Sequence, residues 1–485
     1  MALRIRWPFV LTLFALAAIP AHLNFLRREH LHTNEFFHYY VGTKYFPEVG
    51  YAGLYDAAVV ADLEDDPAGH TALQGIRSLT TYAIVPRQSV WDRRDAIAAR
   101  FTPARWAAFK QDIAFFREAD GPLWTMGESL RDHGYNGTPL VTAILGGLAR
   151  QPALAPAAFI HLAAWWDILL IIVAAALVER ALGATTGVLF LFLWFVNPLN
   201  DYGYTGGAYL RSLHVLALVG AFTAFARGRR TLSGVGFGVA TVLRIFPVLF
   251  LAGFLMQTVL APARRRLWTE RAPLFAVAAA TAVVLVAATA ILPFAGGGAA
   301  WVEFGAKMAL HRERLSPNVV GLADLFFYDR THSVAEVMRL NAAGRRVDWS
   351  AEAEKSLASR RLPYTATVLA ALALLGLALR SGSDSDGWTA GLVLIYLLLH
   401  LAHYDYAILA LAPLMLRPPQ PKLILALLLL FVSVGLVRLA PAAIESLDAR
   451  YAAISVLVGL YLASILWMRR PRVALPPPPG RSRRG

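Results

Sequence analysis

The 485-residue sequence contains no cysteine and few charged residues. The absence of cysteine excludes disulfide scaffolds, thiolate metal sites and cysteine nucleophiles. Only 16% of the residues are charged and 57% are apolar, whereas soluble domains have about 25% and roughly 45–50%. This shortage of charge excludes an ordinary soluble or disordered protein, and it predicts an all-α polytopic membrane protein.

Apolar segments that are long enough to cross a bilayer recur along the chain. The full-length ones cover residues 7–26, 156–178, 272–294, 363–380, 422–440 and 451–468. Shorter ones, which we expect to be tilted or buried in protein, cover 185–199, 208–226, 386–401 and 404–416. Segment 232–260 contains Arg244 and Pro247 and predicts two short helices that meet near Arg244, because proline interrupts helices and a charge within the membrane is costly. The total is about 12 transmembrane or partial helices.

Positive charge is concentrated in the segments predicted to be cytoplasmic. These are residues 1–6, 179–184, 227–230, 261–271, 380–387, 417–422 and 469–485. They contain 19 Lys and Arg and 4 Asp and Glu, a net charge of +15, and the remaining residues sum to −1. The positive-inside rule therefore predicts that both termini are cytoplasmic. A cleaved signal peptide at residues 7–26, after Arg4 and Arg6, is the alternative that fits this charge pattern less well.

The predicted organisation has six parts. They are a first span (1–26), an outside loop with interfacial helices (27–137), membrane helices (138–294) with a broken pair at 231–260, a second outside loop (295–362), C-terminal membrane helices (363–468) and a basic cytoplasmic tail (469–485). Residues 138–150 are too few for a span and predict a half-buried or re-entrant helix. Long loops in a membrane protein usually carry function, so we expect the functional site at the outside face.

The first candidate group follows the first predicted span. Glu35 lies there among Phe36, Phe37 and Tyr39. Desolvation by aromatic rings raises the pKa of a carboxyl group, which suits a general base. His38 would share a helical face with Glu35 and could orient the carboxylate. The alternative interpretation is an aromatic belt with a solvated glutamate.

The second candidate group lies between two apolar segments near the C-terminus. It contains His400, His403, Tyr404, Asp405 and Tyr406. Ionisable residues within or at the ends of membrane segments are functional candidates. A polar cap on a helix hairpin is the alternative. No spacing among these residues and Glu35 is specific for a metal, so a divalent metal ion stays open as a cofactor.

Cations on the outside face form the third candidate group. They are Arg211, His214, Arg244, Lys307, His311, Arg312 and Arg314. Arginine beside helix ends suits phosphate oxygens, although snorkelling to lipid headgroups would explain any single one. No basic stripe with interleaved aromatic residues is present, which argues against nucleic acid as a partner.

Several short motifs follow one another in a familiar order. They are Glu35 to Tyr40, Gly50 to Asp56, Tyr135 to Leu140, Arg244 to Pro247, Ser316 to Gly321 and His403 to Pro413. This order resembles the membrane-embedded GT-C glycosyltransferases, in particular the bacterial polyprenol-phosphate-dependent mannosyltransferase-like branch. The sequence departs from that family in having Glu35 where Asp is more frequent, Arg244 where Lys is more frequent, and a longer insert between Asp56 and Tyr135.

The resemblance implies inverting transfer of mannose or another hexose or pentose from a polyprenyl-phosphate donor to a hydroxyl of a lipid or glycan acceptor. It implies that Glu35 is the general base and that His38, His403 and Asp405 assist it. The residues implied in binding the donor phosphate are Arg211, Arg244, His311, Arg312, Arg314 and Asn318. The implied location is a bacterial inner membrane, with membrane lipids as further partners. A polytopic transporter or lipid flippase remains the alternative function, and a non-catalytic scaffold or sensor is a further one.

Overall fold

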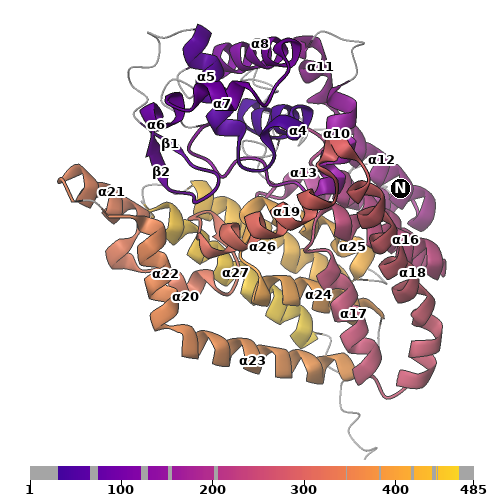
Figure 1. Cartoon of the computed structure of the whole chain (residues 1–485). Coiled ribbons are helices and arrows are strands. Elements are labelled where there is room, and N and C mark those ends of the chain that lie inside the picture. Colours follow the sequence, from indigo (N-terminus) through magenta and orange to yellow (C-terminus); the bar gives the residue numbers. More distant parts are fainter. Residues whose placement is uncertain are drawn as a thin grey trace, which may run out of the picture.

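The computed structural model describes residues 31–65, 75–121, 129–150, 156–200, 206–345, 347–381, 384–416, 420–439, 444 and 446–468. These residues form an all-helical fold with two short pairs of strands (Figure 1). The first predicted span and the basic tail lie outside the described residues.

Five helical segments are long and apolar enough to cross a membrane, which is the pattern of a multi-pass membrane protein. They are Pro156–Leu182, which comprises α11 (Pro156–Ala163) and α12 (Trp166–Leu182), α18 (Arg264–Ala290), α23 (Arg361–Ala378), α26 (Pro421–Leu439) and α27 (Leu447–Met468). They coincide with five of the six full-length segments that hydropathy predicts, and the sixth is the undescribed segment 7–26.

Shorter apolar helices pack among these five. They are α10 (Pro139–Ala149), α13 (Ala184–Val196), α15 (Leu213–Ala226), α16 (Arg230–Leu243), α17 (Val248–Leu260) and α24 (Asp384–Leu398). The interruption expected near Arg244 lies between α16 and α17, where Arg244 has an extended backbone (φ −143°, ψ 128°) and Pro247 precedes the next helix.

One apolar segment differs from the expected regular helix. Residues His403–Leu411 form a 3-10 helix, η6, which leads into α25 (Ala412–Met415). Pro413 has no N–H and cannot donate the hydrogen bond that would continue an α-helix from this segment. A 3-10 helix of nine residues is unusually long, since runs beyond 3–4 residues are uncommon.

Glycines allow the short helices to approach their neighbours closely. A Cβ on Gly234 or Gly238 of α16 would lie 2.6–2.7 Å from carbonyl oxygens of α18. A Cβ on Gly253 of α17 would lie 2.5 Å from the backbone nitrogen of Gly391 in α24. Such contacts maximise packing between helices in a bilayer, where burial from water contributes little.

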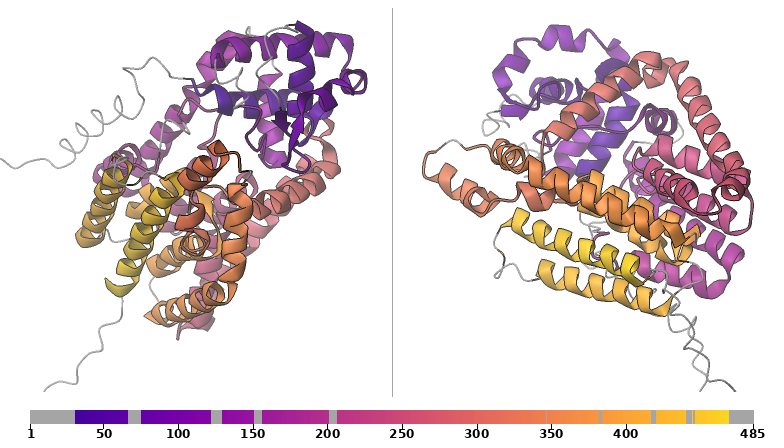
Figure 2. Two further views of the ribbon diagram at one scale, coloured as in Figure 1. Left: turned by 90° about the vertical axis from the view of Figure 1, so that its left-hand side faces the viewer. Right: turned by 90° about the horizontal axis from the view of Figure 1, so that it is seen from below.

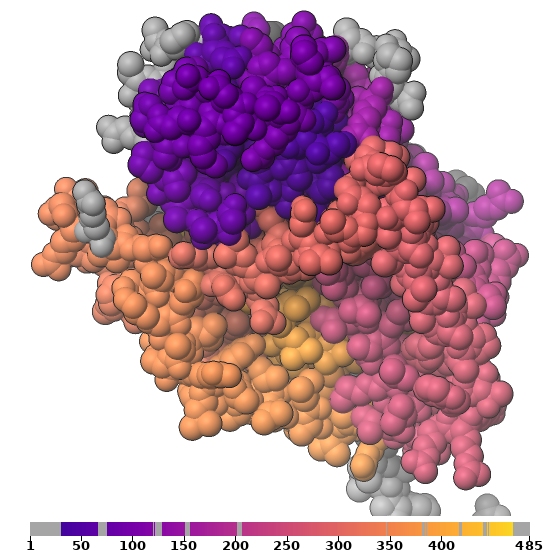
Figure 3. All heavy atoms as spheres, in the orientation of Figure 1, coloured from indigo at the N-terminus to yellow at the C-terminus, as the bar shows by residue number. Residues whose placement is uncertain are grey.

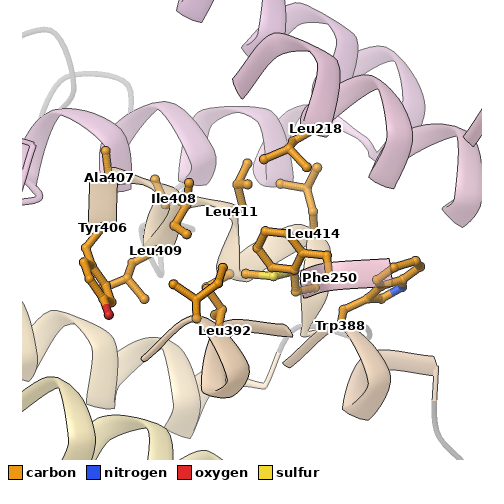
Figure 4. Packing of buried hydrophobic residues seen from close by; sticks show 14 of the residues in the cluster. Leu218, Phe250, Trp388, Leu392, Tyr406, Ala407, Ile408, Leu409, Leu411 and Leu414 are labelled. Carbon is orange, nitrogen blue, oxygen red and sulfur yellow. The ribbon is translucent and has the colours of Figure 1, made fainter. Parts of the chain in front are cut away.

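The largest apolar core joins α15, α17 and α24 to the segment after Asp405 (Figure 4). The rings of Phe254 and Trp388 stack with their centroids 4.0 Å apart. Ile408, Leu409 and Leu411 of η6 are at most 1% exposed. The unusual 3-10 segment is therefore fixed by packing over most of its length.

The segment predicted to be the first outside loop, for which we keep that name, forms a helical layer above the apolar helices, coloured indigo to purple in Figure 1. Its elements are α2 (Thr33–Phe36), the π-helix η2 (Phe37–Val41), α3 (Gly42–Lys44), α4 (Phe46–Val49), α5 (Leu54–Asp65), α6 (Arg87–Trp91), α7 (Arg94–Ala98) and α8 (Pro103–Asp120). The strands β1 (Gly75–Arg77) and β2 (Ile84–Pro86) pair antiparallel, with Ile76 opposite Val85. A separate aromatic and aliphatic core holds this layer together.

The second outside loop connects this layer to the apolar helices. It contains η3 (Pro293–Ala295), α19 (Gly297–Glu313), β3 (Val319–Val320), α20 (Asp324–Phe327), η4 (Arg330–His332), α21 (Val334–Ala342) and α22 (Trp349–Ser359). Helix α19 lies directly beneath the first outside loop in the space-filling view (Figure 3). Strand β3 pairs antiparallel with β4 (Leu401–Ala402), which immediately precedes η6. The short helix η5 (Leu379–Ser381) follows α23. The left view of Figure 2 shows the same stacking of this layer on the apolar helices from a further side.

Candidate functional site

Glu35 lies where a short α-helix changes into a π-helix. Its backbone N–H donates to Nδ1 of His32, 3.1 Å away, at the start of α2. The π-helix η2 follows directly and contains Tyr39. Such π-turns occur mostly as single insertions in helices and are frequent at functional sites. The unusual backbone therefore lies in the same segment that the sequence predicts as the first candidate group.

The carboxylate of Glu35 forms an ion pair with Arg211. Oε1 of Glu35 lies 2.5 Å from Nη1 of Arg211, and the two side chains are only 18% and 10% exposed. The guanidinium carbon of Arg211 also lies 4.2 Å from the ring centroid of Tyr404. Partial removal from water strengthens both interactions. A residue of the first outside loop is thus held by Arg211, which precedes α15, and Arg211 in turn packs on Tyr404 of η6.

Asp167 of α12 fixes the backbone that carries Arg211. Its two carboxylate oxygens accept hydrogen bonds from the backbone N–H groups of Arg211 and Ser212, at 3.1 and 2.5 Å. These groups precede α15, and a carboxylate is favourable at the N-terminal end of a helix.

Arg244 and Asp405 lie close to the same ion pair. The charges of both act on Arg211 and on Tyr39. Burial raises the pKa of the Tyr39 phenol, and the neighbouring charge of Arg244 opposes that change. Among the residues that the structure describes, Arg244 forms no ion pair. We refer to Glu35, Tyr39, Arg211, Arg244, Tyr404 and Asp405 as the ion cluster.

The ion cluster is built where regular helices are interrupted. Glu35 precedes a π-helix, Arg244 occupies the break between α16 and α17, and Asp405 lies in the first turn of the 3-10 helix η6. Irregular backbone beside membrane helices exposes polar groups that regular helices would satisfy internally. Its occurrence at three points around one ion pair makes the ion cluster the candidate functional site.

His38 lies behind this cluster and is 2% exposed. Its Nδ1 is 2.7 Å from the carbonyl oxygen of Asn34, so this nitrogen must carry the proton. Burial lowers the pKa of His38 and favours the neutral ring, whose Nε2 then accepts from the hydroxyl of Tyr55 at 2.6 Å. The Tyr55 oxygen in turn accepts from the backbone N–H of Gly134 at 3.0 Å. His38 therefore holds the segment of Glu35 against the segment 129–137, and it has a positioning role.

His403 and Asn318 are joined by hydrogen bonds, and the His403 ring also packs edge-on against Tyr404 of the ion cluster, with centroids 5.2 Å apart. The carbonyl oxygen of Asn318 accepts from the backbone N–H of His403 at 3.0 Å and from its Nδ1 at 3.2 Å. The His403 ring is fully buried and packs against Tyr451 with centroids 4.7 Å apart. The pair secures β3 to the start of η6, and so positions Asp405.

Three of the remaining predicted cations lie further out. His311 is 3.5 Å from the hydroxyl of Tyr82, Arg312 is exposed, and Arg314 forms a long ion pair of 3.5 Å with Asp348. These three residues belong to α19 or follow it directly. The structure brings together Glu35, Arg211, Arg244 and Asp405 from the predicted set, and it places His311, Arg312 and Arg314 outside the ion cluster.

Sequence reasoning missed Asp132. Nδ2 of Asn34 is 3.4 Å from one oxygen of its carboxylate, and Nδ1 of His133 is 3.3 Å from the other. In the sequence, Asp132 begins a polar stretch near the end of the predicted outside loop 27–137, and this position alone did not indicate a functional residue. Within the described residues, no three His, Asp or Glu side chains form a group that could hold a metal ion.

The fold and the site define a multi-pass helical membrane protein with a polar ion cluster at one face of its apolar helices. No family model, curated protein or solved structure matches the chain. The ion cluster is therefore the basis for any statement about function.

Proposed function

We propose that the protein is a membrane glycosyltransferase, which transfers a sugar from a polyprenyl-phosphate donor to an acceptor hydroxyl at the outside face. The observation that carries this proposal is the Glu35–Arg211 ion pair, with Arg244 beside it, at the junction of the first outside loop and the apolar helices. A lipid-linked phosphosugar has an apolar tail, an anionic phosphate and a reactive anomeric carbon. Apolar helices, an arginine and a carboxylate at one junction suit these three parts.

Arg244 is the residue best suited to the donor phosphate. It carries a full positive charge and forms no ion pair among the described residues, whereas Arg211 is already paired with Glu35. Guanidinium groups bind phosphate oxygens through paired, charge-assisted hydrogen bonds. We assign Arg244 to the leaving phosphate and Arg211 to the orientation of Glu35.

Glu35 then acts as general base in a single displacement. The acceptor oxygen forms a bond to the anomeric carbon while the bond between that carbon and the phosphate oxygen breaks. The acceptor proton passes to a carboxylate oxygen of Glu35, and the electron pair leaves with polyprenyl phosphate. One displacement inverts the configuration at the anomeric carbon. Arg244 stabilises the charge that develops on the phosphate.

The test is a transfer reaction with the purified full-length protein in liposomes. The donors are polyprenyl-phosphate mannose, glucose and arabinose, and the acceptors are a simple methyl glycoside and a lipid alcohol. Formation of free polyprenyl phosphate together with a glycosylated acceptor supports the proposal. Movement of an intact donor between leaflets without its consumption would contradict the proposal and support a lipid flippase.

A further inference from the structure

A second polar group lies where the two outside loops meet. It consists of Tyr82, Asp132, His133, Lys307 and His311, which we call the seam cluster. The ring of His133 packs edge-on against Tyr82 and His311, with centroids 4.9 and 5.2 Å apart. Nζ of Lys307 lies 5.4 Å from the Tyr82 ring centroid. Residues of the β1–β2 turn, the segment 129–137 and α19 therefore converge there.

The charges of the seam cluster are nearly balanced at neutral pH. Lys307 is 5% exposed and donates to the carbonyl oxygen of Tyr51 at 3.2 Å. Burial lowers the pKa of Lys307 to about 8 and that of His311 to about 4. The hydrogen bond with His133 and the electrostatic interaction with His38 lower the pKa of Asp132. One carboxylate thus faces one ammonium group and a neutral His311.

The backbone around this cluster is held in unusual conformations. Tyr82 has a φ of +57° although it is not glycine, a region that non-glycine residues rarely adopt. Gly134 has a φ of +70°, and a Cβ there would lie 2.7 Å from the side chain of Leu79. Strained residues of this kind concentrate at functional sites. They fix Tyr82 and the segment of Asp132 on the two sides of the cluster.

The cluster also presents hydrogen-bond acceptors next to Glu35. Half of the Asp132 side chain (48%) remains exposed. Asn34, the residue before Glu35, donates to Asp132, while its own Oδ1 is buried and has no hydrogen-bond partner among the described residues. An ionised carboxylate is an acceptor only, and the amide oxygen is an acceptor too. A ligand that satisfies both must offer several donors.

We propose that Asn34 and the seam cluster form a binding site for a neutral sugar, and that this sugar is the acceptor in the proposed reaction. This inference rests on the proposed function for the role of the sugar, but not for its binding. Hydroxyl groups of the sugar donate to Asp132 and to Oδ1 of Asn34, and a further hydroxyl reaches Glu35. The acceptor is accordingly a glycan rather than a simple lipid alcohol.

Other ligand classes fit less well. A phosphate would meet the carboxylate of Asp132, and a cation would meet the ammonium group of Lys307. A lipid alcohol has one hydroxyl group and can donate to only one of the two acceptors, the Asp132 carboxylate or Oδ1 of Asn34, which costs binding energy. The donor phosphate is held by Arg244 in the ion cluster, so the donor sugar does not need this second site.

The first experiment measures binding alone. Saturation-transfer NMR with methyl α-mannopyranoside is applied to the full-length protein in nanodiscs. We expect a signal for the wild type that Asp132→Asn loses and that Asp92→Asn keeps, because Asp92 is exposed in the same loop and bonds only locally, to Gln88. No signal in the wild type, or an equal signal in Asp132→Asn, would overturn the site. Asn34→Ala provides a second variant that weakens the same signal if Asp132→Asn does not fold.

The second experiment assigns the sugar to donor or acceptor. With polyprenyl-phosphate mannose as donor, Asp132→Asn should raise the KM for methyl α-mannopyranoside at least tenfold and lower kcat by less than about threefold, since a hydrogen bond to a charged group is worth roughly a factor of ten or more. A rise in the donor KM instead would overturn the acceptor assignment. Glycoside binding without donor consumption by the wild type would reject the proposed function and leave the sugar site intact.

Discussion

Oε1 of Glu35 lies 2.5 Å from Nη1 of Arg211, although most of the first outside loop and the apolar helices α10 to α13 separate the two residues in the sequence. The backbone of Arg211 is held by Asp167, and its guanidinium packs on Tyr404. The arginine that pairs with the Glu35 carboxylate is therefore itself held at its backbone and at its guanidinium group. The proposed base is oriented by contacts that exist before any substrate binds.

Because of this ion pair, substitutions of Glu35 and Arg211 should have non-additive effects on the free energy of unfolding. Removal of Arg211 leaves a mostly buried carboxylate without its partner, so Arg211→Ala should lower the free energy of unfolding by about 3 kcal/mol. The double variant Arg211→Ala/Glu35→Gln should recover at least about 1 kcal/mol of that loss. Thermal unfolding in detergent measures both. Additive effects of the two substitutions would contradict a direct interaction.

Arg244 is expected to act on donor binding. Arg244→Gln removes a charge that is assigned to the phosphate, and it should raise the donor KM by roughly tenfold or more, as charged hydrogen bonds contribute about 1.5–3 kcal/mol. Steady-state kinetics with polyprenyl-phosphate mannose measure the change. Arg339→Gln is the control, because Arg339 is exposed and pairs only with Glu336 of its own helix. An unchanged donor KM in Arg244→Gln would remove Arg244 from the donor site.

Protonation of His311, which is partly buried, should lower the free energy of unfolding in mild acid. Its pKa is about 4 in the folded protein and about 6.5 in the unfolded chain. Between these values the unfolded chain binds more protons, so stability is complete above pH 6.5 and falls as the pH drops towards 4, by up to about 3 kcal/mol. The Tm should therefore be lower at pH 5 than at pH 7, and His311→Gln should reduce this difference. An equal difference in His311→Gln and in the control His332→Gln, whose ring is 42% exposed, would show that His311 does not cause it.

Because α17 packs closely against α24, adding one methyl group at Gly253 should strongly lower the free energy of unfolding. The Cβ of Gly253→Ala would lie 2.5 Å from a backbone nitrogen of α24, and we expect a loss of about 1–3 kcal/mol from overpacking. Gly435→Ala in α26 is the matched control, since nothing lies within 4 Å of the added atom and alanine favours the helix by up to about 1 kcal/mol. Chemical unfolding in detergent compares the two. Equal stability of both variants would contradict the α17–α24 contact.

Much of the fold follows from hydropathy. Five of the six long apolar segments form helices of membrane-crossing length, and the charge and proline between residues 232 and 260 predict the break at Arg244. The 3-10 helix η6 could not be predicted, because its backbone is fixed by packing against helices that are distant in sequence. Local periodicity does not contain that information.

The candidate site follows from the sequence only in part. Glu35, Arg211, Arg244 and Asp405 could be selected as unusual charges in apolar surroundings, but their mutual pairing depends on how distant helices pack. The partners of Asp167 could not be predicted from the sequence, because its carboxylate accepts from backbone amides, which no side-chain pattern reveals. Asp132 was missed for a similar reason, since its partner Asn34 comes from a different segment of the loop.

The most direct measurement of the central claim is the turnover of Glu35→Gln beside that of Glu48→Gln. Both substitutions neutralise a glutamate of the first outside loop that pairs with an arginine. Glu35 pairs with Arg211, and Glu48 lies 2.6 Å from Arg105. The proposed mechanism predicts that Glu35→Gln lowers sugar transfer from a polyprenyl-phosphate donor by at least about 100-fold, the usual contribution of a general base. Glu48→Gln should stay within about threefold of the wild type. Sugar transfer by folded Glu35→Gln at a rate similar to that of Glu48→Gln would contradict the assignment of Glu35 as the base.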